Sequence, residues 1–153
     1  MKLTGKSRSA GFTLTEVVLA LAILAVVFGG IITASIQATR RAEWSGYSLA
    51  AQALAIQQLE QARSARWDGL PTPVWDEITN IPSISARQLD VPISDTNRPV
   101  WATNYVTIST IQVYANPPAS VRMVRVDTVW PFTRNNEIVF FTNSVADFFA
   151  PDL

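Results

Sequence analysis

Glu16 is the residue of this chain whose type and position most clearly indicate a chemical function. It closes the sequence GFTLTE at residues 11–16 and stands directly before VVLALAILAVVFGGII, a run with no polar side chain. Between Arg8 and Arg40 it is the only charged residue. An acidic residue costs about 2.5–3.5 kcal/mol at the centre of a membrane span, and less near its end. We therefore expect Glu16 to have a function and a partner outside its own span.

The residue types that are missing exclude most enzymatic chemistry. The chain has no histidine and no cysteine, so the commonest general base and the thiolate nucleophile are absent, as are disulfides. Its only lysines, Lys2 and Lys6, precede the apolar run, and without them no Schiff-base chemistry is available. The acidic residues are scattered along the chain. We expect a protein that is not an enzyme and that has no cofactor and no metal site.

The charge balance argues against nucleic-acid binding. Without residues 1–11, the chain keeps nine arginines, twelve acidic residues and no lysine, which makes it mildly acidic. We interpret Arg122, Arg125 and Arg134 as a solvated strand face and turn rather than as a basic patch for DNA.

The segments that position Glu16 form the first half of the chain. Residues 1–11 are basic and rich in small residues, as in a targeting segment. Residues 12–37 are long enough to span a bilayer, which takes about 20 apolar residues. Within that span, Gly29-Gly30 is a pair of residues that weakens a helix. Residues 38–67 continue the same helix as an amphipathic half that ends before Asp68-Gly69. Its expected buried stripe consists of Trp44, Tyr47, Ala51, Ala55 and Ala62, flanked by Leu54 and Leu59 and interrupted by Gln58.

The second half of the chain has the pattern of a small β domain. Residues 68–99 contain five prolines and predict a loop with one short strand near 84–91. Residues 100–153 predict an antiparallel meander with strands at 100–114, 121–130 and 137–145. The alternation shifts at Ser109-Thr110, where we expect a bulge, and residues 116–118 and 131–136 are expected turns. The predicted fold is α+β, with a long N-terminal helix packed on three or four antiparallel strands.

Two ordinary interpretations of the N-terminus compete. Residues 1–35 could be a secretory signal peptide cut near residues 34–38, but the apolar run exceeds the usual 7–15 residues and the helical pattern continues past that point. The second is a single-pass anchor for a β domain, in which Glu16 has no special role.

Taken together, the basic leader, Gly11, Phe12, Glu16 and the apolar run resemble the N-terminus of type IV prepilins and type II secretion pseudopilins. In that family, prepilin peptidase removes a leader after a glycine, the new N-terminal residue is N-methylated, and the fifth mature residue is acidic. The resemblance implies a cut between Gly11 and Phe12. It also implies that Glu16 pairs with the Phe12 amine of a neighbouring subunit. Such an amine has an ordinary pKa of about 7.7–8.0.

The resemblance also implies a subclass, partners and a location. Residues 48–66 and 124–146 are similar to the helix and closing hairpin of minor pseudopilins of the I type and PilV-type minor pilins. The implied function is a minor structural subunit of a pseudopilus or pilus. The implied partners are other pilin or pseudopilin subunits, the prepilin peptidase/methyltransferase and an inner-membrane assembly platform. The implied location is the bacterial inner membrane, crossed once, with a cytoplasmic leader and a periplasmic C-terminal domain that later joins a filament.

The five tryptophans divide into two groups. Trp44 and Trp130 fall on apolar faces and are expected in the core. Trp67, Trp75 and Trp101 fall in or beside the proline-rich loop, where they could mark a subunit contact. Asp147 and Asp152 are separated by four residues, three of them apolar and one a proline, so we expect no acidic calcium-binding loop.

Overall fold

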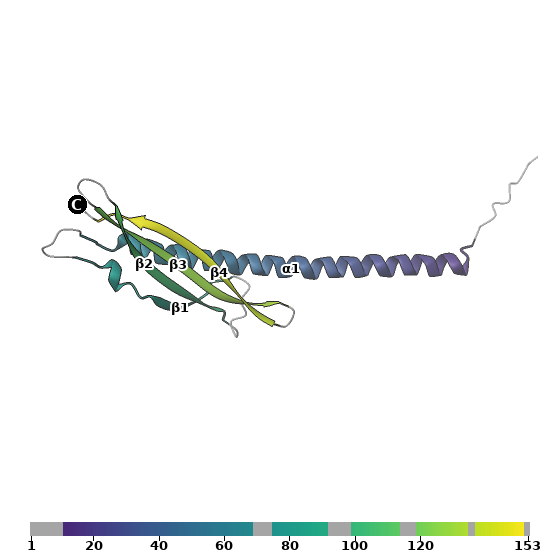
Figure 1. Ribbon diagram of the computed structural model, residues 1–153. Helices are drawn as coiled ribbons and strands as arrows, with labels where there is room; N and C mark the ends of the chain where they lie inside the picture. The colour runs from purple at the N-terminus through teal and green to yellow at the C-terminus, as the bar shows by residue number, and fades with distance from the viewer. Residues whose placement is uncertain (1–10, 69–74, 92–98, 114–118, 135–136, 152–153) are drawn as a thin grey trace, which may run out of the picture. The chain divides into compact units, whose positions relative to one another are not determined.

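The computed structural model describes residues 11–68, 75–91, 99–113, 119–134 and 137–151. Its first element is α1 (Leu14–Ser64), a single helix of 51 residues (Figure 1). This confirms the predicted long N-terminal helix, which ends at Ser64, within a few residues of the expected point. The leader residues Lys2, Lys6 and Arg8 lie outside the described residues, as does the expected turn at 116–118.

One antiparallel sheet follows the helix. Its strands are β1 (Ile84–Gln88), β2 (Trp101–Val113), β3 (Ala119–Arg134) and β4 (Glu137–Phe149), in the spatial order β1-β2-β3-β4. A short 3₁₀ helix, Ile78–Asn80, precedes β1. The described residues therefore confirm the α+β class with four antiparallel strands. They also confirm the short strand predicted within the proline-rich segment, because β1 falls inside residues 84–91.

The expected bulge in β2 is wrong. The register between β2 and β3 is unbroken from Thr103↔Val129 to Val113↔Ala119, and it passes through Ser109↔Met123. The shift in hydrophobic alternation has another cause. Ile108 is the last residue of β2 that packs against the core, and the side chains of residues 110–112 beyond it are exposed. Alternation stops there because no core remains for it to follow.

The expected turn at residues 131–136 and the end of the last strand are also wrong. β3 continues through Pro131 to Arg134, and β4 runs on to Phe149. Pro131 pairs with Phe140 on β4. It lies beyond the last residue of β3 that pairs with β2, Val129, so its missing N–H breaks no ladder on that side.

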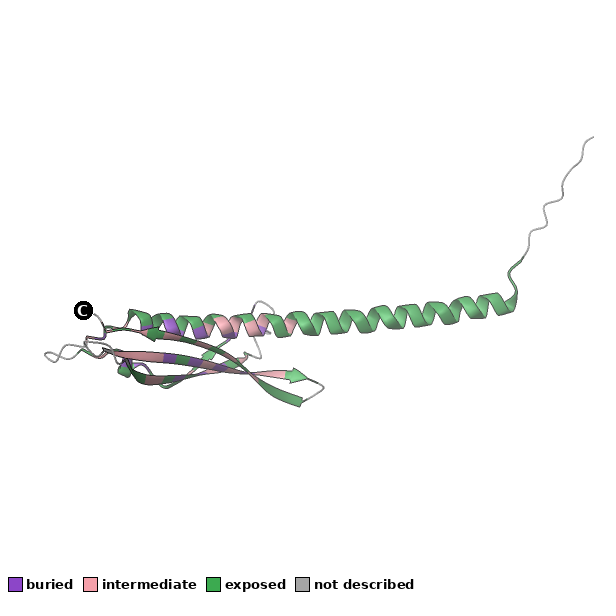
Figure 2. Cartoon of the chain, turned by 45° about the horizontal axis from the view of Figure 1, so that its top comes forward, coloured by how far each residue is buried: buried purple, intermediate pink, exposed green. Residues whose placement is uncertain are grey.

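The chain divides into two compact units, residues 1–41 and residues 42–153. In the second unit, one face of α1 packs on the sheet, and Figure 2 shows its buried residues along that face. The predicted stripe is largely confirmed, since Ala51, Ala55 and Ala62 are at most 1% exposed. Alanines allow the helix to approach the sheet closely. The buried helix residues are Tyr47, Ala51, Ala55, Gln58, Leu59 and Ala62.

Two clusters form the core of the second unit. Near the end of α1, Leu59 packs with Ile78, Val124 and other apolar residues. Toward residue 47, Tyr47 packs with Leu89 and Trp130. Trp130 is fully buried, which confirms that expectation. Trp44 is 39% exposed, so it is only partly core, although its ring lies 6.2 Å from Trp130 and 5.8 Å from Phe141 between centroids.

Candidate processing and assembly motif

The motif begins just before α1. Gly11, Phe12 and Thr13 precede the helix, and Glu16 lies in its first turn. Thr13 is the capping residue. Its backbone N–H donates to Oε2 of Glu16 at 2.8 Å, and its hydroxyl donates to the same oxygen at 2.9 Å. The N–H of Glu16 in turn donates to the Thr13 hydroxyl oxygen at 3.3 Å. This reciprocal arrangement is a capping box.

The capping box adds a partner of Glu16 that was not predicted, while the expected partner outside the span stays a prediction. Its carboxylate has a partner within its own chain, the amide and hydroxyl of Thr13, although that partner carries no charge. The spacing Thr-x-x-Glu at the start of an apolar helix is the known signal for such a cap, and it was present in the sequence. Oε2 of Glu16 accepts both hydrogen bonds that Thr13 donates. The cap therefore satisfies hydrogen-bonding groups at the helix start and leaves the negative charge uncompensated.

Gly11 is exposed, and a Cβ added to it would meet no atom within 4 Å. The fold therefore gives no reason for a glycine at this position. Phe12 is 86% exposed. In the uncut chain its nitrogen is a peptide amide, and only cleavage after Gly11 would turn it into a cation. The geometry thus places the three predicted residues on one accessible stretch at the helix start.

The apolar part of α1 begins at this motif. The helix is long and apolar enough to cross a membrane, and none of its most apolar window is buried within the protein. Val26 is 76% exposed and Phe28 is 55% exposed. Gly29-Gly30 does not interrupt the helix, and the Thr33 hydroxyl donates to the Gly29 carbonyl at 2.8 Å.

The model of the prokaryotic N-terminal methylation motif matches residues 6–32. The chain carries a prepilin-type methylation motif. It is thereby consistent with the type IV pilin-like family, and the motif indicates a pilin or pseudopilin precursor that prepilin peptidase processes. No curated protein and no solved structure matches the chain.

For a pilin-like precursor, the long apolar helix fits a transmembrane anchor. The family is structural rather than catalytic, and its motif implies association with other pilin subunits and with prepilin peptidase. Within the described residues, no group of three or more acidic, histidine or cysteine side chains could hold a metal ion.

Two residues of the second unit, Arg122 and Trp67, do not lie where the sequence predicted. Arg122 is not on a solvated face, because its side chain is 14% exposed and forms a bidentate pair with Asp76. Its guanidinium also lies 4.4 Å from the ring centroid of Trp67. Trp67 is 6% exposed, so it belongs to the core of the second unit and is not a surface contact. The hydrogen bonds from Arg122 hold the pKa of Asp76 below its ordinary value.

The other arginines and tryptophans predicted at the surface are exposed. Arg125 is exposed and pairs with Asp127 on its own strand at 2.9 Å, and Arg134 is exposed. Trp75 and Trp101 are 46% and 55% exposed, so both remain available for contacts.

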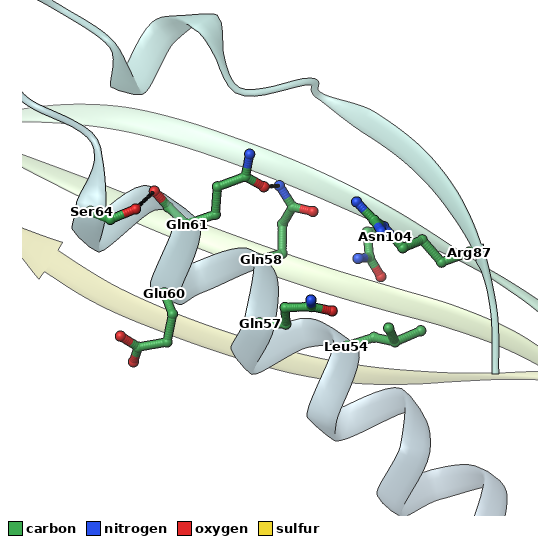
Figure 3. A pocket seen from close by; sticks show the side chains of 8 residues that line it. All are labelled: Leu54, Gln57, Gln58, Glu60, Gln61, Ser64, Arg87 and Asn104. Carbon is green, nitrogen blue, oxygen red and sulfur yellow. Dashed lines mark hydrogen bonds between the residues drawn. The ribbon is translucent and has the colours of Figure 1, made fainter. Parts of the chain in front are cut away.

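A polar groove of about 470 Å³ lies between α1 and the strands β1 and β2 (Figure 3). Three of its amide side chains have hydrogen-bond partners: Gln58 donates to Gln61 at 3.0 Å, and Asn104 accepts from the Thr128 hydroxyl at 2.8 Å. Among the described residues that line the groove, no nucleophile is hydrogen-bonded to a base. The residues that line it are Leu54, Gln57, Gln58, Glu60, Gln61, Ser64, Arg87 and Asn104.

Proposed function

We propose that this protein is a non-enzymatic, minor pilin-like subunit of a type II secretion pseudopilus or a type IV pilus. Prepilin peptidase cuts it between Gly11 and Phe12, the new terminus is methylated, and the subunit polymerises through the first half of α1. An assembly platform of the inner membrane receives it, with the leader in the cytoplasm and the β domain in the periplasm. The observation that carries the proposal is the methylation motif at residues 6–32, which includes the start of an unburied apolar helix.

Cleavage supplies the charge that the capping box lacks. Thr13 satisfies hydrogen bonds of Glu16, but it is neutral. Once the leader is removed, Phe12 carries an ammonium group, and a neighbouring subunit can bring that group to Glu16. A carboxylate that is buried among apolar helices without a cation is strongly disfavoured. Pairing between subunits therefore couples processing to assembly.

Mass spectrometry of the protein purified from its host tests the processing step. We expect a mature chain that begins with N-methylated Phe12. An intact Met1, or a cut near residues 34–38, would contradict the proposal and favour a simple anchor or a secretory signal peptide.

A second candidate function is a single-pass anchored β domain that binds a partner and never polymerises. The capping box favours it, because the hydrogen bonds with Thr13 give Glu16 a role within its own helix. Two substitutions separate the candidates. Glu16→Gln retains an oxygen that can accept from Thr13, while Glu16→Ala removes both the cap and the charge.

The readout is the amount of each variant in the sheared filament fraction relative to the membrane fraction of the host. If assembly needs the charge, both variants insert into the membrane normally, and both are depleted from filaments by a similar factor. If Glu16 acts only as a helix cap, Glu16→Gln enters filaments as the wild type does. A chain that is cleaved and methylated but never found in filaments would support the anchored β domain.

A further inference from the structure

The sheet has a second face, opposite the one that packs on α1 (Figure 2). Side chains alternate along a strand, so the residues of β2 between the buried Ala102, Asn104 and Val106 point to this second face. The register extends the same assignment to the other three strands. We call this surface the outer face. Large exposed apolar residues occur on it in β1, β2 and β4: Ile84, Trp101, Tyr105, Ile111, Ile138, Phe140 and Phe148.

The outer face is also nearly free of charge. Among its described residues only Arg125 and Asp127 are charged, and they pair with each other at 2.9 Å. An antiparallel sheet with one solvated face normally places polar residues on that face. Depletion of charge and enrichment in aromatic residues are instead typical of the centre of a protein interface. The outer face therefore has the composition of a surface that another protein covers.

The size of the outer face matches one side of a stable protein interface. The four strands place about 20 described residues on it, and such an interface takes about 20–30 residues from each partner. Tyr105, Phe140 and Phe148 are 43%, 68% and 60% exposed, and Trp101 is 55% exposed. At about 200 Å² for a whole aromatic side chain, these four rings offer roughly 450 Å², more than half of the roughly 800 Å² that each partner buries.

We propose that the outer face binds the outer face of a second copy of the chain, so that two sheets pack face to face around a two-fold axis. Such a contact uses the same surface twice, and the only charges among the described residues of this surface already neutralise each other. Packed sheets keep their strands within about 30° of each other. With the two-fold axis along the strands, β2 of one copy lies over β3 of the other.

The residues that this axis brings together are complementary. In the register between β2 and β3, Tyr105 is level with Asp127 and Ile111 is level with Val121. In the dimer, Tyr105 of each copy therefore lies near Asp127 of the other, where its hydroxyl can donate to a carboxylate oxygen. Ile111 of each copy lies near Val121 of the other, which is an apolar contact. Both contacts are made twice.

The same axis keeps the two copies of α1 parallel. Within the second unit α1 runs along β4, because Trp44 contacts Phe141 and Arg63 pairs with Asp147 further along both elements. An axis along the strands does not reverse this direction. Both chains then enter the dimer from the same end, as two chains anchored in one membrane require. The proposal concerns the second unit alone, so it is independent of processing and filament assembly.

Sedimentation equilibrium of the full-length chain in density-matched detergent tests the proposal. Tyr105→Arg places a charge on the outer face, and Phe140→Arg does so on another strand in case one variant folds poorly. Leu49→Arg is the matched control, since Leu49 is 69% exposed but lies on α1. Near-UV circular dichroism checks the fold of each variant. We expect wild type and Leu49→Arg to form the same concentration-dependent dimer, and both outer-face variants to associate at least tenfold more weakly.

Mixing two variants tests whether the outer face meets its own copy. Position 105 lies on β2, next to the two-fold axis, so the two copies of this residue are close to each other in the dimer. We expect an equal mixture of Tyr105→Arg and Tyr105→Glu to associate at least tenfold more tightly than either variant alone. No gain on mixing would contradict the face-to-face contact. A wild type that stays monomeric would overturn the proposal, as would a dimer that both outer-face variants leave unchanged, because the apolar half of α1 would then hold it.

Discussion

The two units of this protein obtain their stability in opposite ways. In residues 42–153, one face of α1 is covered by the sheet, and Ala51 and Ala55 are fully buried. In residues 14–41, every residue of the same helix is exposed within the chain, including Val26 at 76%. The second unit contains its own core, whereas the first must be completed by something outside the subunit. Lipid and neighbouring helices both provide apolar surroundings, so under the proposed function one surface would serve both in the membrane and in a filament.

The largest expected effect is on the core of the second unit. Trp130→Ala removes a fully buried indole that stacks on Phe141 at 5.2 Å and donates from Nε1 to Asn143 at 2.7 Å. We expect a loss of about 3–5 kcal/mol in the free energy of unfolding, because a large cavity remains and the amide oxygen of Asn143 loses its donor. Urea unfolding of the detergent-solubilised chain, followed by near-UV circular dichroism, measures it.

Trp75→Ala is the matched control, since Trp75 is 46% exposed and its ring contact is with Arg66. It should cost about 1 kcal/mol or less. Both variants should resist alkaline extraction from membranes, because the anchor lies in the other unit. Release of Trp130→Ala from the membrane would show that the two units depend on each other.

A smaller effect is expected at the largely buried ion pair between Arg122 and Asp76 in the same unit. Asp76→Asn leaves the guanidinium of Arg122 largely buried over Trp67 without its anion. We expect a loss of about 2–3 kcal/mol at pH 7. Asp147→Asn, which disrupts the exposed pair with Arg63, should change the unfolding midpoint very little. Equal effects at the two sites would contradict the distinction between buried and exposed pairs.

The pH dependence gives an independent check on the same pair. The pKa of Asp76 is lowered in the folded state, chiefly by the hydrogen bonds from Arg122. The pair therefore contributes its full stability above the ordinary aspartate pKa of about 4 and loses it as pH falls through the lowered value. In melts between pH 7 and pH 2, the difference between wild type and Asp76→Asn should shrink below about pH 4. A difference that stays constant would exclude an ionic role for Asp76.

Elements with local sequence signals were predictable, and contacts between distant segments were not. The helix, its alanine stripe and the alternating strands follow from periodicity within a few residues. Arg122 and Asp76 are 46 positions apart, and Asp76 lies inside the proline-rich segment, so nothing local reveals their pairing. From the sequence alone, Arg122 is therefore predicted on a solvated strand face and Trp67 in or beside a loop. The capping box is the opposite case, because its Thr-x-x-Glu signal is local and can be found in the sequence alone.

A local effect of about 1 kcal/mol is expected at the start of α1. Thr13→Ala removes the capping hydroxyl, which accepts from the N–H of Glu16 and donates to its carboxylate. The first turn should fray while the rest of the helix is unchanged. Amide hydrogen exchange in the full-length chain should show faster exchange at residues 14–17 alone. Thr13→Ser retains the hydroxyl and should exchange as the wild type does. Unchanged exchange in Thr13→Ala would mean that the capping box contributes nothing to the helix start.

The smallest structural effect is expected at Gly11, where a Cβ would meet no atom of the chain. Gly11→Ala should leave the unfolding midpoint, the hydrogen exchange of α1 and membrane anchoring unchanged. If prepilin peptidase cuts after Gly11, the added methyl group meets the protease instead, and the precursor should accumulate with residues 1–11 attached. If Gly11→Ala leaves the folded protein unchanged but blocks maturation, the requirement for glycine comes from the protease and not from the fold. Normal maturation of Gly11→Ala would remove the steric argument for glycine, and the cut site would then have to be found by sequencing the mature terminus.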